Sequence, residues 1–123
     1  MICLDTNYLI LGLVAGSRES DLLRRWIAEE VPLVAPAVVW YEFLCGPVHE
    51  RQVATMRAFL QEIVVFSGAH AHVAAELFNN GGRRRSTWVD AMIAATAIMA
   101  DAPLATNNTP DFEAFQSAGL RLA

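Results

Sequence analysis

The stretch that decides the fold is MICLDTN, Met1–Asn7, in which four apolar residues lead directly into Asp5, Thr6 and Asn7. Such a short apolar run is typical of a buried strand, and Asn7 is a favoured cap for a helix that follows it. The rest of the chain repeats this alternation of short apolar runs and longer helical patterns. We therefore predict an α/β fold, a parallel sheet with helices on both faces.

The same reasoning places the other elements. The expected strands are 1–4, 31–35, 62–66 and 102–105, with an edge strand at 120–122. The expected helices begin after Asn7, at Ser17 and at Pro36, span 48–61, 69–79 and 88–100, and begin again at Pro110. The first of them is expected to end at Gly16, because glycine commonly terminates helices. In a parallel sheet the carboxyl ends of the strands share one edge, where ligands bind.

Composition narrows the function. The chain has 123 residues, which predicts one domain over 1–123, and 54% of them are apolar. The net charge is −4 and the chain contains nine Arg but no Lys, which excludes Schiff-base and P-loop lysine chemistry. A mildly acidic chain is poorly suited to coat nucleic acid, although a metal-dependent nuclease stays compatible with it.

The expected compartment is the cytoplasm. The first residues carry no basic leader, and no apolar run approaches the roughly 18 residues of a membrane helix, so no membrane partner is expected. Cys3 and Cys45 are too few for a disulfide scaffold and are expected to be buried thiols in a reducing compartment.

Four carboxylates stand out because each is the only charged residue of a long stretch: Asp5 within 1–17, Glu42 within 31–48, Asp90 within 86–100 and Asp111 within 102–112. A lone carboxylate in an apolar segment is costly unless it is paired or bound to a metal. Like charges gathered at one sheet edge would repel, and a divalent cation removes that repulsion. Oxygen ligands favour Mg²⁺ or Mn²⁺.

Simpler roles exist for two of these acids. Asp90 stands three residues after Thr87 and could complete a capping box, whereas Asp111 could serve only to favour a helix N-terminus. The positions of Asp5 and Glu42 are harder to explain by local structure alone.

Four segments together resemble the PIN domain, and more narrowly the VapC ribonuclease toxins of bacterial toxin–antitoxin pairs. They are LDTN at 4–7, YEF at 41–43, WVDAMIAATA at 88–97 and TNNTPDF at 106–112. Each is weak alone, whereas their order and spacing are specific across essentially the whole chain. The resemblance implies a three-layer α/β/α sandwich with a five-stranded, mainly parallel sheet.

The resemblance also implies an endoribonuclease that depends on Mg²⁺, for which Mn²⁺ may substitute. The implied catalytic residues and metal ligands are Asp5, Glu42, Asp90 and Asp111, supported by Thr6, Asn7, Thr106 and Asn108. Position 107 is Asn, where many members of the family carry a basic residue. The implied partners are an RNA substrate, a cognate antitoxin of the VapB type and a second copy of the chain in a homodimer.

Arg83, Arg84 and Arg85 form the only basic cluster. They could contact RNA phosphates or acidic groups of an antitoxin, or could simply form a solvated loop. The three histidines lack the spacing of a metal site, because His70 and His72 do not share a helix face. Trp26, Trp40 and Trp88 are expected in the core or at an interface.

Other functions fit less well. A phosphotransferase of the haloacid-dehalogenase type requires a second Asp two residues after Asp5, where this chain has Asn7. A receiver domain requires a Lys, and dinucleotide binding requires a glycine-rich turn after the first strand. A PIN-like binding module with weak catalysis remains the alternative, although its carboxylates are intact.

Overall fold

The computed structural model describes all residues, 1–123, as strands that alternate with helices. The strands are β1 (Ile2–Leu4), β2 (Leu33–Pro36), β3 (Glu62–Val64) and β4 (Leu104–Ala105). The helices are α1 (Thr6–Leu11), α2 (Arg18–Ala28), α3 (Ala37–Cys45), α4 (Glu50–Phe59), α5 (Gly68–Asn80), α6 (Trp88–Met99) and α7 (Thr109–Phe112), with short 3-10 turns η1 (Arg85–Thr87) and η2 (Glu113–Ala118).

All four strands are parallel and lie in the order β3-β2-β1-β4. Each strand therefore directs its last residue toward the same edge of the sheet. The fifth strand expected at 120–122 is reduced to a single bridge, in which Leu122 pairs with Leu104. The reduction follows from the length of β4, whose two residues offer a fifth strand little backbone to pair with.

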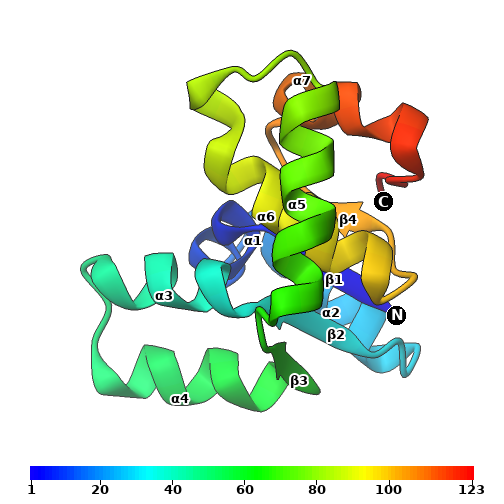
Figure 1. Cartoon of the computed structure of the whole chain (residues 1–123). Helices are drawn as coiled ribbons and strands as arrows, with labels where there is room; N and C mark the ends of the chain where they lie inside the picture. The colour runs from blue at the N-terminus through cyan, green and yellow to red at the C-terminus, as the bar shows by residue number, and fades with distance from the viewer.

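Helices cover both faces of this sheet, which confirms the α/β/α sandwich (Figure 1). Helices α5 and α6 pack closely against each other, and α6 also contacts β2, whereas α1 contacts α2 and α3. Helices α3 and α4 run side by side as a pair that projects from the sheet (Figure 1).

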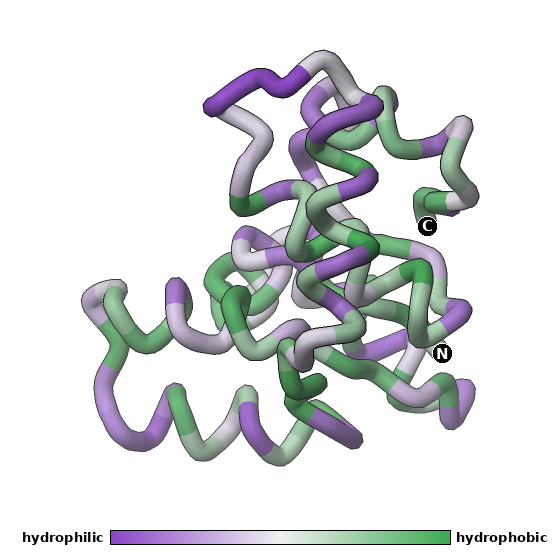
Figure 2. The backbone as a smooth tube through the Cα atoms, in the orientation of Figure 1, coloured by the Kyte–Doolittle hydropathy of each residue, from purple (hydrophilic) through white to green (hydrophobic).

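The core is centred on β1, β2 and β4, in which every residue is buried, whereas β3 is a more exposed edge strand. The tube in Figure 2 accordingly turns green along the central strands and through α6. The nearly uniform apolar surface of α6 is explained by its position, because it packs between the sheet and α5.

Two details of α1 differ from the sequence prediction. The cap is Asp5 instead of Asn7, and its Oδ1 accepts the Thr6 amide at 2.7 Å, because the helix begins immediately where β1 ends. The helix stops at Leu11 instead of continuing to Gly16. At Gly12 a Cβ atom would lie 2.3 Å from Leu23 Cδ1, so only glycine permits α2 to approach this closely.

The two cysteines have different surroundings. Cys3 is buried in β1, as expected, but Cys45 is exposed at the last turn of α3, so the prediction for Cys45 was wrong. Its apolar sequence neighbours lie on more than one face of α3, because Phe43 is buried and Leu44 is exposed. None of the helices is both long enough and apolar enough to span a lipid bilayer.

Candidate active site

Asp5 is the buried centre of the site. It ends β1, and its side chain is only 5% exposed. One carboxylate oxygen accepts the Thr6 amide, and the other accepts the hydroxyl of Thr106 at 2.7 Å. The Thr106 oxygen in turn accepts the Asn108 amide at 3.0 Å. The parallel pairing of Leu4 with Ala105 explains this contact, because it brings the ends of β1 and β4 side by side.

Glu42 reaches the same edge from α3, which begins directly after β2. Its Oε2 accepts the Thr6 hydroxyl at 3.2 Å, which ties α3 to the start of α1. Partial burial raises the pKa of Glu42, the Thr6 hydrogen bond lowers it, and the charge of Asp5 raises it again. Asp5 and Glu42 therefore interact electrostatically across Thr6.

Asp90 lies in the first turn of α6 and makes no capping box. The Thr87 hydroxyl donates to the carbonyl oxygen of Arg84 at 2.7 Å, and no side-chain cap is present at that helix start. Burial raises the pKa of Asp90 to about 6, and the charges of Asp111, Asp5 and Glu42 raise it as well. The other three predicted acids therefore all lie close enough to Asp90 for their charges to affect it.

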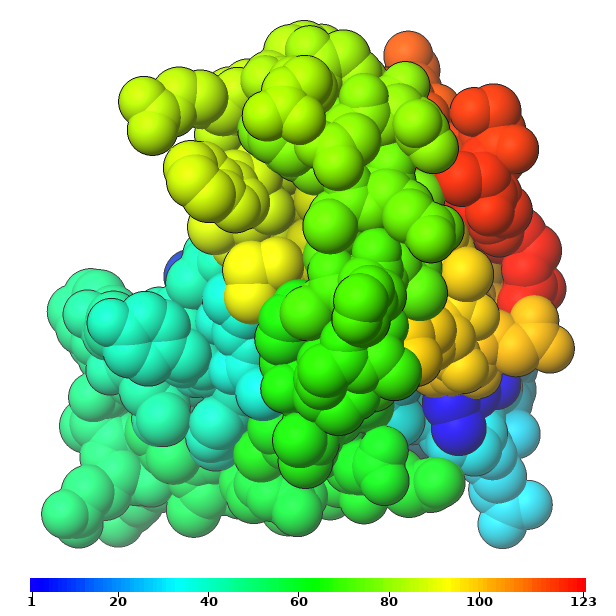
Figure 3. Space-filling model, viewed as in Figure 1, coloured from blue at the N-terminus to red at the C-terminus, as the bar shows by residue number.

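A cleft of about 440 Å³ opens between α1, α3 and α6. In Figure 3 a hollow separates the cyan surface of α3 from the yellow-green start of α6. Six of the residues predicted from the sequence line this cleft: Asp5, Thr6, Asn7, Glu42, Asp90 and Asn108.

The other predicted residues do not line the cleft. Thr106 acts through Asp5, whereas Asp111 is exposed on α7 and reaches Asp90 through its charge. Arg83, Arg84 and Arg85 belong to the loop and 3-10 turn between α5 and α6. Asn107 donates to Glu19 at 3.2 Å, which anchors the loop after β4 to α2.

Four cleft residues were not predicted. Val38 and Tyr41 share the face of α3 that carries Glu42, and Val89 and Ile93 lie on α6 beside Asp90. Their spacing of three or four residues from one another on each helix is the signal that could have identified them. Tyr41 is 66% exposed and stands at the rim.

The donor set fits a hard divalent cation. Only oxygen ligands face the cleft, and the pKa of Asp90 is raised first by burial and then by the negative charges of the other three acids. No three His, Cys, Asp or Glu side chains lie close enough together to hold one ion on their own. Mg²⁺ is commonly held by one or two carboxylates and several waters, so Asp5 and Asp90 with water suffice.

Comparisons with known proteins give the family. The PIN domain model matches residues 2–116, and no curated protein sequence matches the chain. A chain in a toxin–antitoxin complex from Klebsiella pneumoniae shares 28% identity over 91% of this chain and 90% of its own, with a TM-score of 0.71.

Two further solved structures share the fold. FitAcB from Neisseria gonorrhoeae matches at 21% identity over 99% of this chain and 96% of that chain, with a TM-score of 0.73. VapBC2 from Rickettsia felis, bound to a DNA fragment from its promoter, matches at 24% identity, 100% and 98% coverage and a TM-score of 0.70. With its model matched over nearly the whole length, this chain belongs to the PIN domain family.

Proposed function

We propose that the chain is a metal-dependent endoribonuclease and the VapC-like toxin of a toxin–antitoxin pair. The observation that carries the proposal is the group of four acids at one sheet edge, whose mutual repulsion contributes to the raised pKa of Asp90. The related structure from Klebsiella pneumoniae, itself a toxin–antitoxin complex, supports the toxin role.

Each residue of the site has its own proposed role. Thr6 and Thr106 hold both oxygens of Asp5, so this ligand is oriented before anything binds. Asp90 must be ionised to bind a cation, which a pKa of about 6 permits at neutral pH. Glu42 uses Oε2 to accept from Thr6, which leaves Oε1 to orient water. A bound Mg²⁺ supplies charge that activates water and offsets the charge developing on the phosphoryl oxygens.

The expected reaction is hydrolysis of RNA phosphodiester bonds in the cytoplasm. A cognate antitoxin of the VapB type is the proposed inhibitor, and a homodimer is the proposed assembly. These partners are proposed on the family membership and on the toxin–antitoxin complexes among the similar structures. Mn²⁺ is expected to replace Mg²⁺, because oxygen ligands accept both ions.

The test is cleavage of RNA by the purified chain with Mg²⁺, with Mn²⁺ and with EDTA. We expect cleavage with either metal, none with EDTA, and none from Asp5→Asn. Glu50→Gln is the matched control, because Glu50 is exposed at the start of α4 and lies outside the cleft. Equal cleavage by Asp5→Asn and the parent would contradict the proposal.

A second experiment identifies the target. RNA ends are mapped after brief expression of the chain in cells and compared with ends from cells expressing Asp5→Asn. New ends that depend on Asp5 would identify the RNA. If no new ends appear and no metal binds, the chain acts instead as a binding module.

A further inference from the structure

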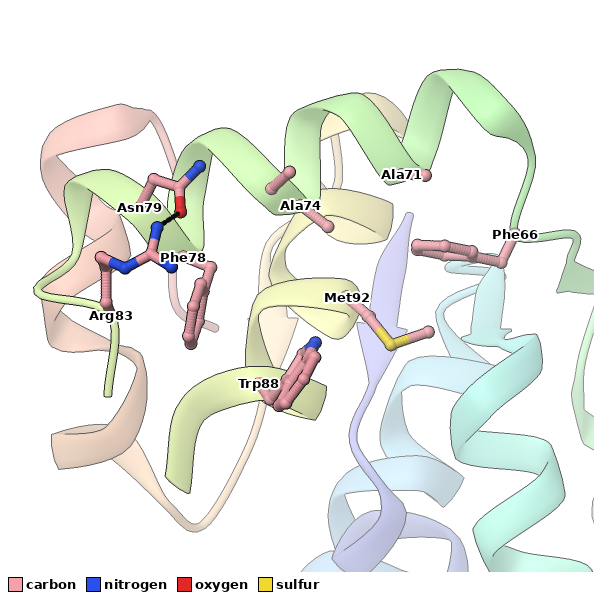
Figure 4. Close-up of a pocket in the computed structure, with 9 residues that line it drawn as sticks. Phe66, Ala71, Ala74, Phe78, Asn79, Arg83, Trp88 and Met92 are labelled. Atoms are coloured by element: carbon pink, nitrogen blue, oxygen red, sulfur yellow. Dashed lines mark hydrogen bonds between the residues drawn. The ribbon is translucent and has the colours of Figure 1, made fainter. Parts of the chain in front are cut away.

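A second concave surface lies where α5 packs against α6. Its volume is about 300 Å³, near the lower end of the usual range for ligand pockets. Three aromatic side chains and a methionine line it together with small alanines of α5 (Figure 4). We call it the aromatic groove, with Phe66, Phe78, Trp88 and Met92 as its defining residues.

The main feature of the aromatic groove is an exposed tryptophan. Trp88 is 56% exposed and therefore lies outside the core, whereas an interface position stays a prediction. It stacks on Phe78 with the ring centres 5.8 Å apart and the planes inclined by 27°. Figure 4 shows the indole of Trp88 on α6 beside the Phe78 ring of α5.

Uncompensated positive charge borders the same groove. Arg83 lies 5.6 Å from the centre of the Phe78 ring, and Arg85 lies 5.7 Å from that of Trp88. Arg83 also donates to the neutral side chain of Asn79. The only two ion pairs in the chain lie elsewhere and join Arg25 to Glu29 and Arg121 to Asp101. The segment with Arg83–Arg85 is accordingly deep purple after α5 in Figure 2.

The groove adjoins the carboxylate cleft. Successive helical residues turn by about 100°, so Trp88 and Met92 lie on one side of α6, and Val89 and Ile93 lie on the adjacent side. Val89 and Ile93 line the cleft, and Trp88 and Met92 line the groove. The groove and the cleft therefore meet α6 on adjacent sides.

We propose that the aromatic groove and Arg83–Arg85 bind single-stranded RNA next to the cleavage site, with a base stacked on Trp88 and phosphates on the guanidinium groups. This inference rests on the proposed function and specifies its substrate as unpaired RNA. Interleaved arginines and aromatic rings suit a single strand, because unpaired bases offer their faces for stacking while phosphates bind the cations. Bases within a duplex have both faces covered by their neighbours and cannot stack in this way.

The test measures RNA binding without cleavage. A fluorescently labelled, non-self-complementary RNA and its duplex are titrated in EDTA, and anisotropy is followed at several salt concentrations. The variants are Trp88→Leu, Trp88→Phe and the combined Arg83→Gln, Arg84→Gln and Arg85→Gln. The matched control changes the same number of exposed arginines on α2 and α4, namely Arg24, Arg25 and Arg51, to glutamine.

We expect Trp88→Leu to raise the Kd for single-stranded RNA by about fivefold or more and Trp88→Phe to recover most of the affinity. The three loop substitutions should flatten the plot of log Kd against log salt by about two units, because three phosphate contacts are lost. The duplex should bind more weakly than the single strand and should not respond to Trp88→Leu. The control variant should bind like the parent.

Other outcomes would overturn the inference. The inference would be wrong if the loop and Trp88 variants kept the affinity and salt dependence of the parent. It would also be wrong if the control variant lost as much RNA affinity as the loop variant. If the same variants lost only self-association in sedimentation, or only antitoxin binding, the groove would be a protein interface and the RNA proposal would be wrong. Cleavage by the parent with Mg²⁺ is measured alongside. If the parent cleaves RNA but the groove variants bind RNA like the parent, only the inference about the groove is wrong. If the parent does not cleave RNA, the proposed function is wrong.

Discussion

At the scale of single residues, the site depends on how Asp90 is surrounded. Three other carboxylates raise its pKa beyond the effect of burial, and no arginine is paired with any of the four. Two hydrogen-bond donors hold the carboxylate of Asp5 in a fixed orientation. Asp5 therefore cannot rotate away from Asp90 to relieve the repulsion between them.

The first prediction concerns the stability of the metal-free protein. Because the pKa of Asp90 is raised from 3.8 to about 6, the folded chain keeps a proton between these pH values that the unfolded chain has released. The contribution of Asp90 to the free energy of unfolding should therefore fall as the pH rises from about 4 to 6. Asp90→Asn removes this dependence and should make the metal-free protein more stable at pH 7.

Urea unfolding in EDTA at pH 4 to 7 measures the effect. Glu76→Gln is the control, because Glu76 is exposed on α5 and contributes nothing to the pKa of Asp90. A difference between Asp90→Asn and the parent that stayed constant over this pH range would contradict the assignment.

The second prediction concerns Thr106, which does not line the cleft but bonds both Asp5 and the backbone amide of Asn108. Thr106→Val removes the donor to Asp5 and the acceptor for Asn108, so we expect a loss of about 1 to 3 kcal/mol in the free energy of unfolding. Because a ligand that has lost its orienting partner binds metal less well, Mn²⁺ affinity should fall about tenfold or more. Calorimetric titration and urea unfolding measure both quantities.

Thr55→Val is the control for this substitution, because the Thr55 hydroxyl donates only to a carbonyl of its own helix. A Thr106→Val protein that bound Mn²⁺ as tightly as the Thr55→Val protein would show that Thr106 has no positioning role.

At the scale of elements, α3 determines where Glu42 lies. Its inner face carries Phe43, which is fully buried, and Trp40 packs against Phe43 with ring centres 5.3 Å apart. Its contacts with α1, α6 and β2 hold the helix beside the cleft.

The third prediction tests this anchor. Phe43→Ala should reduce the free energy of unfolding by about 3 to 5 kcal/mol, because it leaves a cavity where a whole ring was buried. Leu44→Ala is the control on the same helix, and because Leu44 is nearly half exposed we expect a loss of only about 0.5 kcal/mol. Similar losses in the two variants would mean that α3 packs differently.

Most elements could be predicted from the sequence, because strands and helices alternate with clear caps at Ser17 and with proline at two helix starts. The end of α1 at Leu11 could not be predicted, because the sequence indicates Gly16 as the stop and the close packing of Gly12 against Leu23 of α2 arises only in the folded chain. All four strands are shorter than predicted, because flanking apolar residues such as Val31, Val65 and Ala102 lie outside any regular element.

At the scale of the whole molecule, the parallel sheet converts four acids that are far apart in sequence into neighbours. This convergence could be predicted, because Asp5, Glu42 and Asp111 follow strands and Asp90 begins the helix that packs on the sheet. The aromatic groove could not, because the exposure of Trp88 depends on how α5 and α6 pack. The metal and the RNA stay predictions.

The most direct test of the central claim is a Mn²⁺ titration followed by the free energy of unfolding, on the parent and on Asp5→Asn. A metal held by Asp5 and Asp90 with water should stabilise the parent by about 1.4 to 2.7 kcal/mol at ten to a hundred times the Kd. Asp5→Asn should show no such gain. Equal stabilisation of both proteins, or of neither, would contradict the account.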